Sequence, residues 1–149
     1  MKYGGGSLGT LQYKQFSYNG YGDYAFTTFP YANTLTYMVH VTSTSTIPMV
    51  SYAYNPPLYT VLSKYGYAGG SASIKVVQTG CMAYYDGLQI LGLTGCQILS
   101  GSAISGDSGG PIKVGNAFCG IVSASWTSGG LYFTPYYYIH QGGFTIYVQ

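Results

Sequence analysis

The sequence predicts an all-β protein, and three features of its composition support this fold class. Of the 149 residues, 19 are tyrosine and 23 are glycine, whereas only 5% are charged. Tyr, Thr, Val and Ile favour strands, while the helix formers Glu and Arg do not occur in the chain. Strand-like runs also recur between glycine-rich turns about every 8–12 residues, which is typical of a sandwich or a barrel.

The expected elements follow these runs along the chain. Strands are predicted over Leu11–Tyr18, Tyr24–Phe29, Thr34–Thr42, Leu58–Lys64, Ser71–Gln78, Leu88–Leu93, Pro111–Val114, Phe118–Ser125 and Leu131–Thr134. One short helix is predicted over Pro135–Gln141, because proline suits the first turn of a helix and the pair Gly142-Gly143 can end it. The final residues, FTIYVQ, are expected to be extended.

Charge and hydropathy exclude several classes of function. The net charge of +2 comes without a basic run, so nucleic acid is not an expected partner. No apolar run reaches the roughly 18 residues of a membrane span, so we expect no membrane partner. The first residues, MKYGGG, lack the apolar core of a signal peptide. A chain with few carboxylates would lose little stability when acids protonate, so an acidic or extracellular setting is expected.

The three cysteines leave two states open. Cys81 and Cys96 could pair in an oxidising compartment, which would leave Cys119 as a small buried residue. All three could equally be reduced thiols. No C-x-x-C motif and no closely spaced histidines suggest zinc, and we expect neither a metal nor a cofactor.

The stretch GDSGGP, residues 106–111, raises the possibility that Ser108 is a nucleophile. It fits the G-x-S-x-G elbow of hydrolases, but that elbow needs a helix after the serine and an acid later in the chain. Here Pro111–Val114 reads as a strand, and no Asp or Glu follows Ser108. The order Asp23, His40, Ser108 is that of the subtilisin triad, whose fold needs long helices that this sequence does not predict.

The chain instead resembles the latter part of the chymotrypsin-like serine proteases, and it is closest to their compact bacterial members. GDSGGP is similar to that family's signature around the nucleophile, and YGDYAFTTF resembles the segment that carries its catalytic aspartate. Farther along, CGIVSASW resembles the strand that lines the specificity pocket, and GLYFTPYYYIHQGGFTIY resembles the closing strand and C-terminal helix. The resemblance covers most of the chain, in order.

This resemblance implies a chymotrypsin-like antiparallel β-barrel fold with a short C-terminal helix. The second barrel would be complete in residues 58–149, residues 43–57 would be an inter-domain connection, and residues 1–42 would be a remnant of the first barrel. Ser108 would be the nucleophile, and Asp23 would orient a histidine. The amides of Gly106 and Ser108 would form the oxyanion hole, and Asp107 would brace the nucleophile loop.

The resemblance also implies a substrate pocket without a charged residue. Its walls would be Ser102, Ala103, Ser123, Ala124, Ser125, Gly129 and Gly130. Ser123 also matches the residue that closes the hydrogen-bond network near the aspartate. Because none of the walls is charged, we expect a polypeptide substrate with an apolar or aromatic side chain at the cleavage site.

The catalytic histidine of the family has no counterpart in this sequence. In the family it precedes the aspartate by several tens of residues, yet none of the 22 residues before Asp23 is a histidine. His40, in a strand-like segment, and His140, in the predicted helix, both read as structural. We therefore expect the C-terminal part of a serine endopeptidase, active only with an N-terminal part that bears the histidine, either in a longer chain or as a separate fragment. The alternative is a non-catalytic, protease-like binding or structural protein of an extracellular surface or coat.

Overall fold

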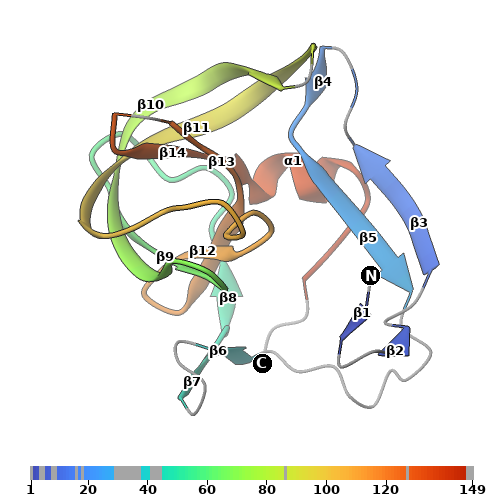
Figure 1. The fold of residues 1–149 in the computed structure, drawn as a ribbon, viewed down its shortest axis with the longest axis horizontal. Coiled ribbons are helices and arrows are strands. Elements are labelled where there is room, and N and C mark those ends of the chain that lie inside the picture. Colours follow the sequence, from blue (N-terminus) through green and yellow to red (C-terminus); the bar gives the residue numbers. More distant parts are fainter. Residues whose placement is uncertain are drawn as a thin grey trace.

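A computed structural model of the chain describes residues 2–3, 6–7, 10–15, 17, 19–28, 38–40, 45–85, 87–126 and 128–146. These residues form mainly strands, and one short helix, α1 (Tyr136–Gln141), lies near the C-terminus (Figure 1). The all-β prediction and the predicted helix are therefore confirmed. No helix in this part of the chain is long and apolar enough to cross a membrane.

A closed, six-stranded antiparallel barrel dominates the structure. Its strands are β9 (Val61–Gly66), β10 (Gly70–Tyr85), β11 (Leu88–Gly101), β12 (Pro111–Val114), β13 (Ala117–Trp126) and β14 (Gly130–Pro135). Around the barrel the order is β10, β9, β12, β13, β14 and β11, and β11 pairs back with β10. Closure leaves none of these strands at a free edge.

The barrel encloses the main hydrophobic core because alternate residues of each strand point inward. The core side chains come from all six strands: Leu62, Ala72, Ile74, Val76, Cys96, Ile112, Cys119, Val122, Leu131 and Phe133. In β9, the two buried residues are Leu62 and Lys64, so one lysine takes a place in this inward series.

The hairpin of β10 and β11 is much longer than the sequence predicted. The predicted strands stopped at Gln78 and Leu93, because the glycines nearby read as turn residues. In the structure β10 continues to Tyr85, and its pairing with β11 shifts register at four places. Gly80 and Gly92 have φ of +65° and +73°, respectively, and lie within the strands, which is typical of bulges that bend a ladder without ending it.

The N-terminal residues lie beside the barrel, on the far side of α1 in Figure 1. Here β3 (Thr10–Gln15) pairs with β5 (Tyr24–Thr28), and β4 (Gly20–Tyr21) joins the barrel sheet along β11. Three further pieces are β8 (Ser51–Tyr52), which runs parallel to β13, and the small pairs β1 (Lys2–Tyr3) with β2 (Gly6–Ser7) and β6 (Met38–His40) with β7 (Thr46–Pro48).

A second apolar cluster joins β5 to the helix and to the barrel. Its buried members are Tyr24, Met49, Phe118, Tyr136 and Ile139. This packing fixes the segment that follows Asp23 against the barrel. The boundaries at residues 42 and 57 stay a prediction, and parts of the predicted strand at residues 34–42 and of the extended tail lie outside the described residues.

Candidate active site

Ser108 lies in a tight loop between β11 and β12. The flanking residues Gly106 and Gly109 have φ of +98° and +84°, left-handed values that side chains other than glycine rarely adopt. The Gly109 amide donates to the Val122 carbonyl of β13 at 2.8 Å, which fixes the loop to the barrel wall. Within the described residues, the amides of Gly106 and Ser108 donate to no protein acceptor. Two backbone donors next to the Ser108 hydroxyl are therefore unoccupied.

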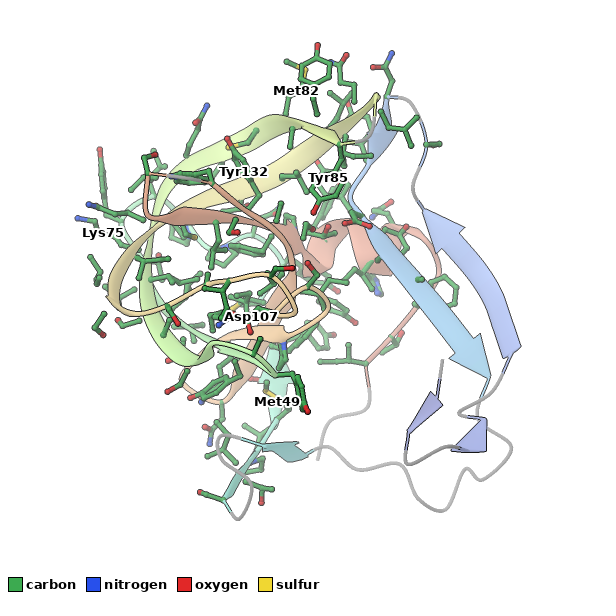
Figure 2. All side chains as sticks on the ribbon, in the orientation of Figure 1. Met49, Lys75, Met82, Tyr85, Asp107 and Tyr132 are labelled. Atoms are coloured by element: carbon green, nitrogen blue, oxygen red, sulfur yellow. The ribbon has the colours of Figure 1, made fainter. Side chains whose placement is uncertain are left out.

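The Asp107 carboxylate is buried among the barrel strands, where Figure 2 labels it, and it binds a buried lysine. Lys64 Nζ donates to Asp107 Oδ2 at 2.5 Å. Oδ1 accepts from the amides of Ala68 and Gly69 at 3.0 and 2.7 Å. Oδ2 also accepts from the Ile104 amide at 3.0 Å. Asp107 thus ties the nucleophile loop to the turn between β9 and β10.

These partners keep Asp107 ionised. Burial by itself would raise the pKa of this carboxyl, but the Lys64 ammonium and the surrounding amides outweigh burial, and the pKa lies below its usual value. Lys64 Nζ also donates to the carbonyls of Gly70 and Ser102 at 3.1 and 2.9 Å. Each of its three protons therefore has an acceptor, which makes a fully buried ammonium tolerable.

Lys64 is a site residue that the sequence analysis missed, although the sequence contains a signal for it. Lys64 follows Leu62 on the inward face of β9. A buried lysine without a partner is strongly unfavourable, so a lysine at an inward position of a strand indicates a buried acid. With only three acids in the chain, Asp107 was one of few possible partners.

Hydrogen bonds connect Ser108 to Asp23 through β13 and β14. Ser108 Oγ donates to the Ser123 carbonyl at 3.2 Å. The hydroxyls of Ser123 and Thr134 lie 2.9 Å apart and share a hydrogen bond. Thr134 Oγ1 accepts from the Asp23 amide at 2.8 Å and donates to the Asp23 carbonyl at 3.1 Å. The structure therefore connects the Ser108 hydroxyl to the backbone of Asp23, with Thr134 as a link that the sequence did not reveal.

The Asp23 side chain is half-buried and accepts no hydrogen bond from the described residues. Burial raises the pKa of its carboxyl above the usual value. Thr134 binds both the amide and the carbonyl of Asp23, which fixes the backbone from which the side chain extends. Within the described residues, the carboxyl oxygens remain available as hydrogen-bond acceptors. This state suits a carboxylate that receives an N–H from an imidazole.

Among the described side chains, no histidine contacts the Asp23 carboxyl. His140 lies in α1, where its ring centroid is 5.3 Å from that of Tyr54 and 5.8 Å from that of Tyr136. Its Nδ1 is buried and has no hydrogen-bond partner among the described residues. The backbone of His40 pairs with Thr46, and the His40 side chain lies outside the described part of the structure.

The predicted pocket residues occupy two regions. Ser102 and Ala103 precede the nucleophile loop, where Ser102 Oγ donates to the Gly69 carbonyl at 3.2 Å. The other five, Ser123, Ala124, Ser125, Gly129 and Gly130, lie on β13, on β14 and in the turn that joins them.

Trp126 covers one of these predicted walls. It is the cross-strand partner of Gly130, and a Cβ atom at Gly130 would lie 1.9 Å from the indole. The Trp126 ring also packs 4.6 Å from that of Tyr132. Because Gly130, Tyr132 and Thr134 alternate with the core residues of β14, they share the outer face of the strand with Trp126. The aromatic pair Trp126 and Tyr132 therefore lies on the same outer face as Thr134, toward the Gly130 end of β14.

The three cysteines are free thiols, and all are buried. The alternative pairing of Cys81 with Cys96 is therefore not formed. Burial raises the pKa of Cys96 to about 12 and that of Cys119 to about 11. In the described part of the chain, no group of three or more His, Cys, Asp or Glu residues could hold a metal ion.

Comparison with solved structures identifies the fold. Cellulomonas bogoriensis chymotrypsin has a TM-score of 0.82 and 23% identity, covering 95% of this chain and 76% of that one. A serine protease described as glutamic acid specific, with a histidine triad in substrate binding, has a TM-score of 0.82 and 22% identity over 97% of this chain and 76% of its own. Nocardiopsis protease has a TM-score of 0.75 and 22% identity over 92% and 77% of the two chains.

The chain thus has the fold of the bacterial chymotrypsin-like serine proteases, as the sequence resemblance predicted. It spans about three-quarters of the length of these neighbours. No protein-family model matches the sequence. A search of curated proteins also finds no match.

Proposed function

We propose that this chain is the nucleophile-bearing part of a serine endopeptidase. Ser108 Oγ attacks the peptide carbonyl while its proton passes to a histidine, and an acyl-enzyme forms as that proton moves to the leaving amine. Water then hydrolyses the acyl-enzyme by the same route. Asp23 orients the histidine, and the amides of Gly106 and Ser108 bind the oxyanion.

The observation that carries the proposal is the state of the nucleophile loop. Its backbone is fixed by Gly109 and by the buried Asp107, while the two amides beside the Ser108 hydroxyl have no acceptor within the described residues. Gly106 and Ser108 are both exposed, so their amides are open to solvent and to a bound substrate. One oxyanion donor typically contributes about 100–1000-fold in rate, so two that are held in place favour catalysis.

The base would come from a histidine outside the described residues, on an N-terminal segment or on a separate fragment. Asp23 supports this part of the proposal, because its carboxyl is half-buried and has no partner among the described residues. An imidazole N–H would satisfy the carboxyl, and the imidazolium that forms during catalysis would lower its raised pKa.

The substrate would be a polypeptide with an apolar or aromatic side chain at the cleavage site. None of the seven predicted pocket residues is charged or a histidine, so the acid specificity described for one structural neighbour is not expected here. The indole of Trp126 and the ring of Tyr132 add apolar surface on the same face of β14. Trp126 over Gly130 would limit how deep that side chain reaches.

A fluorophosphonate probe tests the proposal on the protein in its native source, with the culture medium and the cells labelled separately. Labelling of Ser108, located by peptide mass, is the expected result, and labelling in the medium would support the extracellular location that the low acid content favours. Ser108→Ala should abolish labelling. Ser105→Ala, an exposed serine of the same loop, should leave it intact. Native, folded protein that takes up no probe at Ser108 would overturn the proposal.

A non-catalytic structural role is the second candidate, and the exposed tyrosines favour it. Tyr59, Tyr67 and Tyr84 are 73%, 100% and 68% exposed. Such residues, with few charges around them, suit a component of an extracellular surface or coat that contacts copies of itself. Sedimentation of the native protein as a large assembly, together with a lack of probe labelling, would favour this role over proteolysis.

A further inference from the structure

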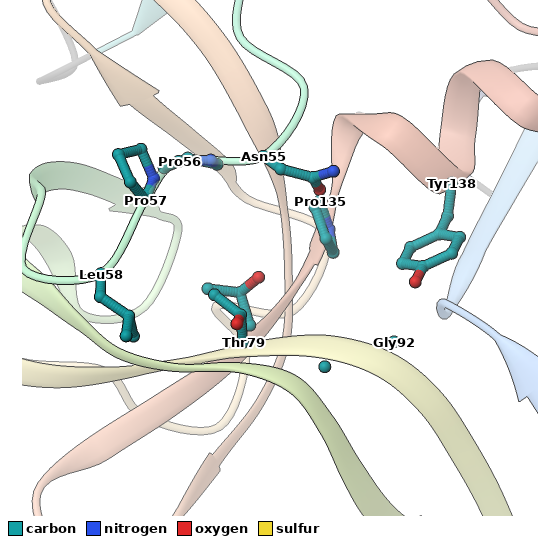
Figure 3. Close-up of a pocket in the computed structure, with 10 residues that line it drawn as sticks. Asn55, Pro56, Pro57, Leu58, Thr79, Gly92, Pro135 and Tyr138 are labelled. Atoms are coloured by element: carbon teal, nitrogen blue, oxygen red, sulfur yellow. The ribbon is translucent and has the colours of Figure 1, made fainter.

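A cavity of about 340 Å³ lies apart from the nucleophile loop, where the connection to the barrel passes the start of α1 (Figure 3). One wall is the segment from Asn55 to Leu58, a second is the β10–β11 hairpin with Thr79 and Thr94, and a third is Tyr138 of the helix. The volume falls in the range of small-molecule sites, roughly 300–1,000 Å³. None of the residues that line the cavity belongs to the nucleophile loop or to the predicted substrate pocket.

The chemistry of the walls restricts what the cavity accepts. No lining residue carries a charge, and burial raises the pKa of Tyr138, so its phenol stays neutral. Prolines, a leucine and the Tyr138 ring supply apolar surface. Four lining side chains, those of Asn55, Thr79, Thr94 and Tyr138, can each both donate and accept hydrogen bonds. In Figure 3, Asn55, Thr79 and Tyr138 lie around the same space on three different elements.

The walls are rigid. Pro56 and Pro57 have a fixed φ, which restricts the connecting segment. The Tyr138 ring lies directly on Gly92, where a Cβ would be only 2.5 Å from the ring, and it packs 5.2 Å from the ring of Tyr21. The hydroxyl of Tyr24 also donates to the Tyr138 carbonyl at 3.2 Å. A preformed site of this kind needs little ordering when a ligand binds.

The backbone next to the cavity forms a hydrogen-bonded turn, Pro57–Thr60. Tyr59 follows the lining residue Leu58 and has φ of +68°, a left-handed value that is unfavourable for a bulky side chain. Its amide donates to the Val76 carbonyl at 2.8 Å, which holds this conformation. The ring is 73% exposed and so contributes little to the core. The Thr60 amide also donates to the Pro57 carbonyl at 3.2 Å, and a positive φ at the third residue is typical of such a turn, which fixes the wall formed by residues 55–58.

We propose that this cavity binds an uncharged sugar ring. The hydroxyl groups of a pyranose both donate and accept hydrogen bonds, which matches the four polar side chains, while its C–H faces match the proline and tyrosine surfaces. A carboxylate or an ammonium ion would find no opposite charge in the walls. A fully apolar ligand would cover the polar atoms of Asn55, Thr79 and Tyr138 without offering them hydrogen-bond partners, which is unfavourable. The site is separate from Ser108 and does not depend on catalysis.

The test is a titration of the ¹⁵N-labelled full chain by NMR. The probes are D-glucose, D-galactose and N-acetyl-D-glucosamine, with sodium glucuronate as a charged counterpart and phenol and cyclohexanol as less polar ring compounds. We expect saturable shifts with at least one neutral sugar, confined to the cavity walls, with a Kd on the order of 1 mM. Ser108→Ala should bind equally well.

Two matched pairs of variants locate the site. Tyr138→Phe and Thr79→Val each remove one hydroxyl and should weaken binding about fivefold. Tyr137→Phe, the neighbouring tyrosine outside the cavity, and Thr46→Val, an exposed threonine of β7, should not. A spectrum that keeps its dispersion shows that each variant is folded. The proposal is overturned if no neutral sugar gives a saturable shift, if phenol binds in the cavity and sugars do not, or if the control variants weaken binding as much as the cavity variants.

Discussion

Lys64 and Asp107 form an ion pair that the barrel encloses completely, with their side chains 0% and 1% exposed. The pair joins the inward face of β9 to the nucleophile loop, 43 residues farther along the chain. Replacing a buried pair by apolar residues is often neutral, whereas removing one partner leaves a buried charge without compensation. The two residues are therefore interdependent, and the backbone around Ser108 depends on both.

Lys64→Met should lower the free energy of unfolding by about 3–5 kcal/mol, because the Asp107 carboxylate loses its counter-charge. Urea denaturation measures the change. Lys75→Met, a half-buried lysine of β10 that is part of no ion pair in the described structure, is the matched control and should change stability by less than about 1 kcal/mol. The double variant Lys64→Met/Asp107→Leu should recover part of the loss. A single variant as stable as the parent would contradict this account.

Asp23→Asn should stabilise the chain at neutral pH by a few tenths to about 1 kcal/mol. The pKa of Asp23 is raised in the folded state, so its contribution to stability is present below the unfolded pKa and is lost as the pH rises through the folded pKa. The gain should therefore vanish at acidic pH. The pKa of Asp107 is lowered in the folded state, so its ionised form stabilises the fold, and this contribution is lost as the pH falls through the folded pKa. Asp107→Asn should therefore destabilise the chain at neutral pH and less so in acid. Urea titrations at several pH values measure the free energy of unfolding of both variants. If both variants change it in the same direction at neutral pH, the two pKa shifts are not as described.

Thr134→Val should cost about 1–3 kcal/mol, because the Asp23 amide and the Ser123 hydroxyl lose their shared partner in a fully buried place. Thr134→Ser keeps the hydroxyl and should retain most of the stability. In the complete protein, Thr134→Val should also slow the labelling of Ser108, since the links between β13, β14 and Asp23 are broken. If the serine and valine variants behave alike, the hydroxyl network is not what matters.

Trp126→Ala should shift the proposed protease toward larger side chains at the cleavage site, by about tenfold in relative kcat/KM, because the indole no longer covers Gly130. Peptides that differ only at this residue provide the measurement. As a single substitution, Gly130→Ala should destabilise the chain, because the new Cβ would collide with Trp126. In the double variant Trp126→Ala/Gly130→Ala this collision is absent, and the destabilisation should disappear. If an active Trp126→Ala protein keeps the parent's preference at the cleavage site, Trp126 does not line the substrate pocket.

The thiols should be unreactive in the folded chain. Cys96 has a pKa of about 12 and Cys119 of about 11, and burial also raises the pKa of Cys81, so almost no thiolate exists near pH 8. Ellman's reagent should react with all three only after denaturation. Fewer than three reactive thiols in the denatured, unreduced protein would reveal a disulfide and contradict the free thiols of the structure.

The elements that the sequence predicted best are two strands flanked by clear turn residues, Gly109-Gly110 before β12 and Gly115-Asn116 between β12 and β13. β12 has the predicted limits, and β13 extends the predicted strand by one residue at each end. The predicted ends of β10 and β11 were wrong because a glycine with positive φ has the same sequence signal in a bulge as in a turn. Only the pairing of the two strands distinguishes these cases.

The candidate site was predictable only as far as local motifs reach. GDSGGP and the segment around Asp23 carry Ser108, Asp107 and Asp23 within short stretches of sequence. Lys64 and Thr134 act from distant strands, and their partners depend on the register of the closed barrel. The inward position of Lys64 in β9 indicates a buried acid but not which one, and nothing near Thr134 in the sequence indicates its partners. For the same reason the covering of Gly130 by Trp126, which arises across a strand pair, was not foreseen.

Closure of the barrel also bears on how copies of this protein can associate. With a net charge of +2 and 5% charged residues, copies of the chain repel one another only weakly. An open sheet of this composition would present unpaired amides and carbonyls to its neighbours, with little electrostatic barrier to edge-to-edge association. In the closed barrel each of β9 to β14 has a partner on both sides. Edge-to-edge association through the barrel strands should therefore depend only weakly on ionic strength and strongly on the barrel remaining closed.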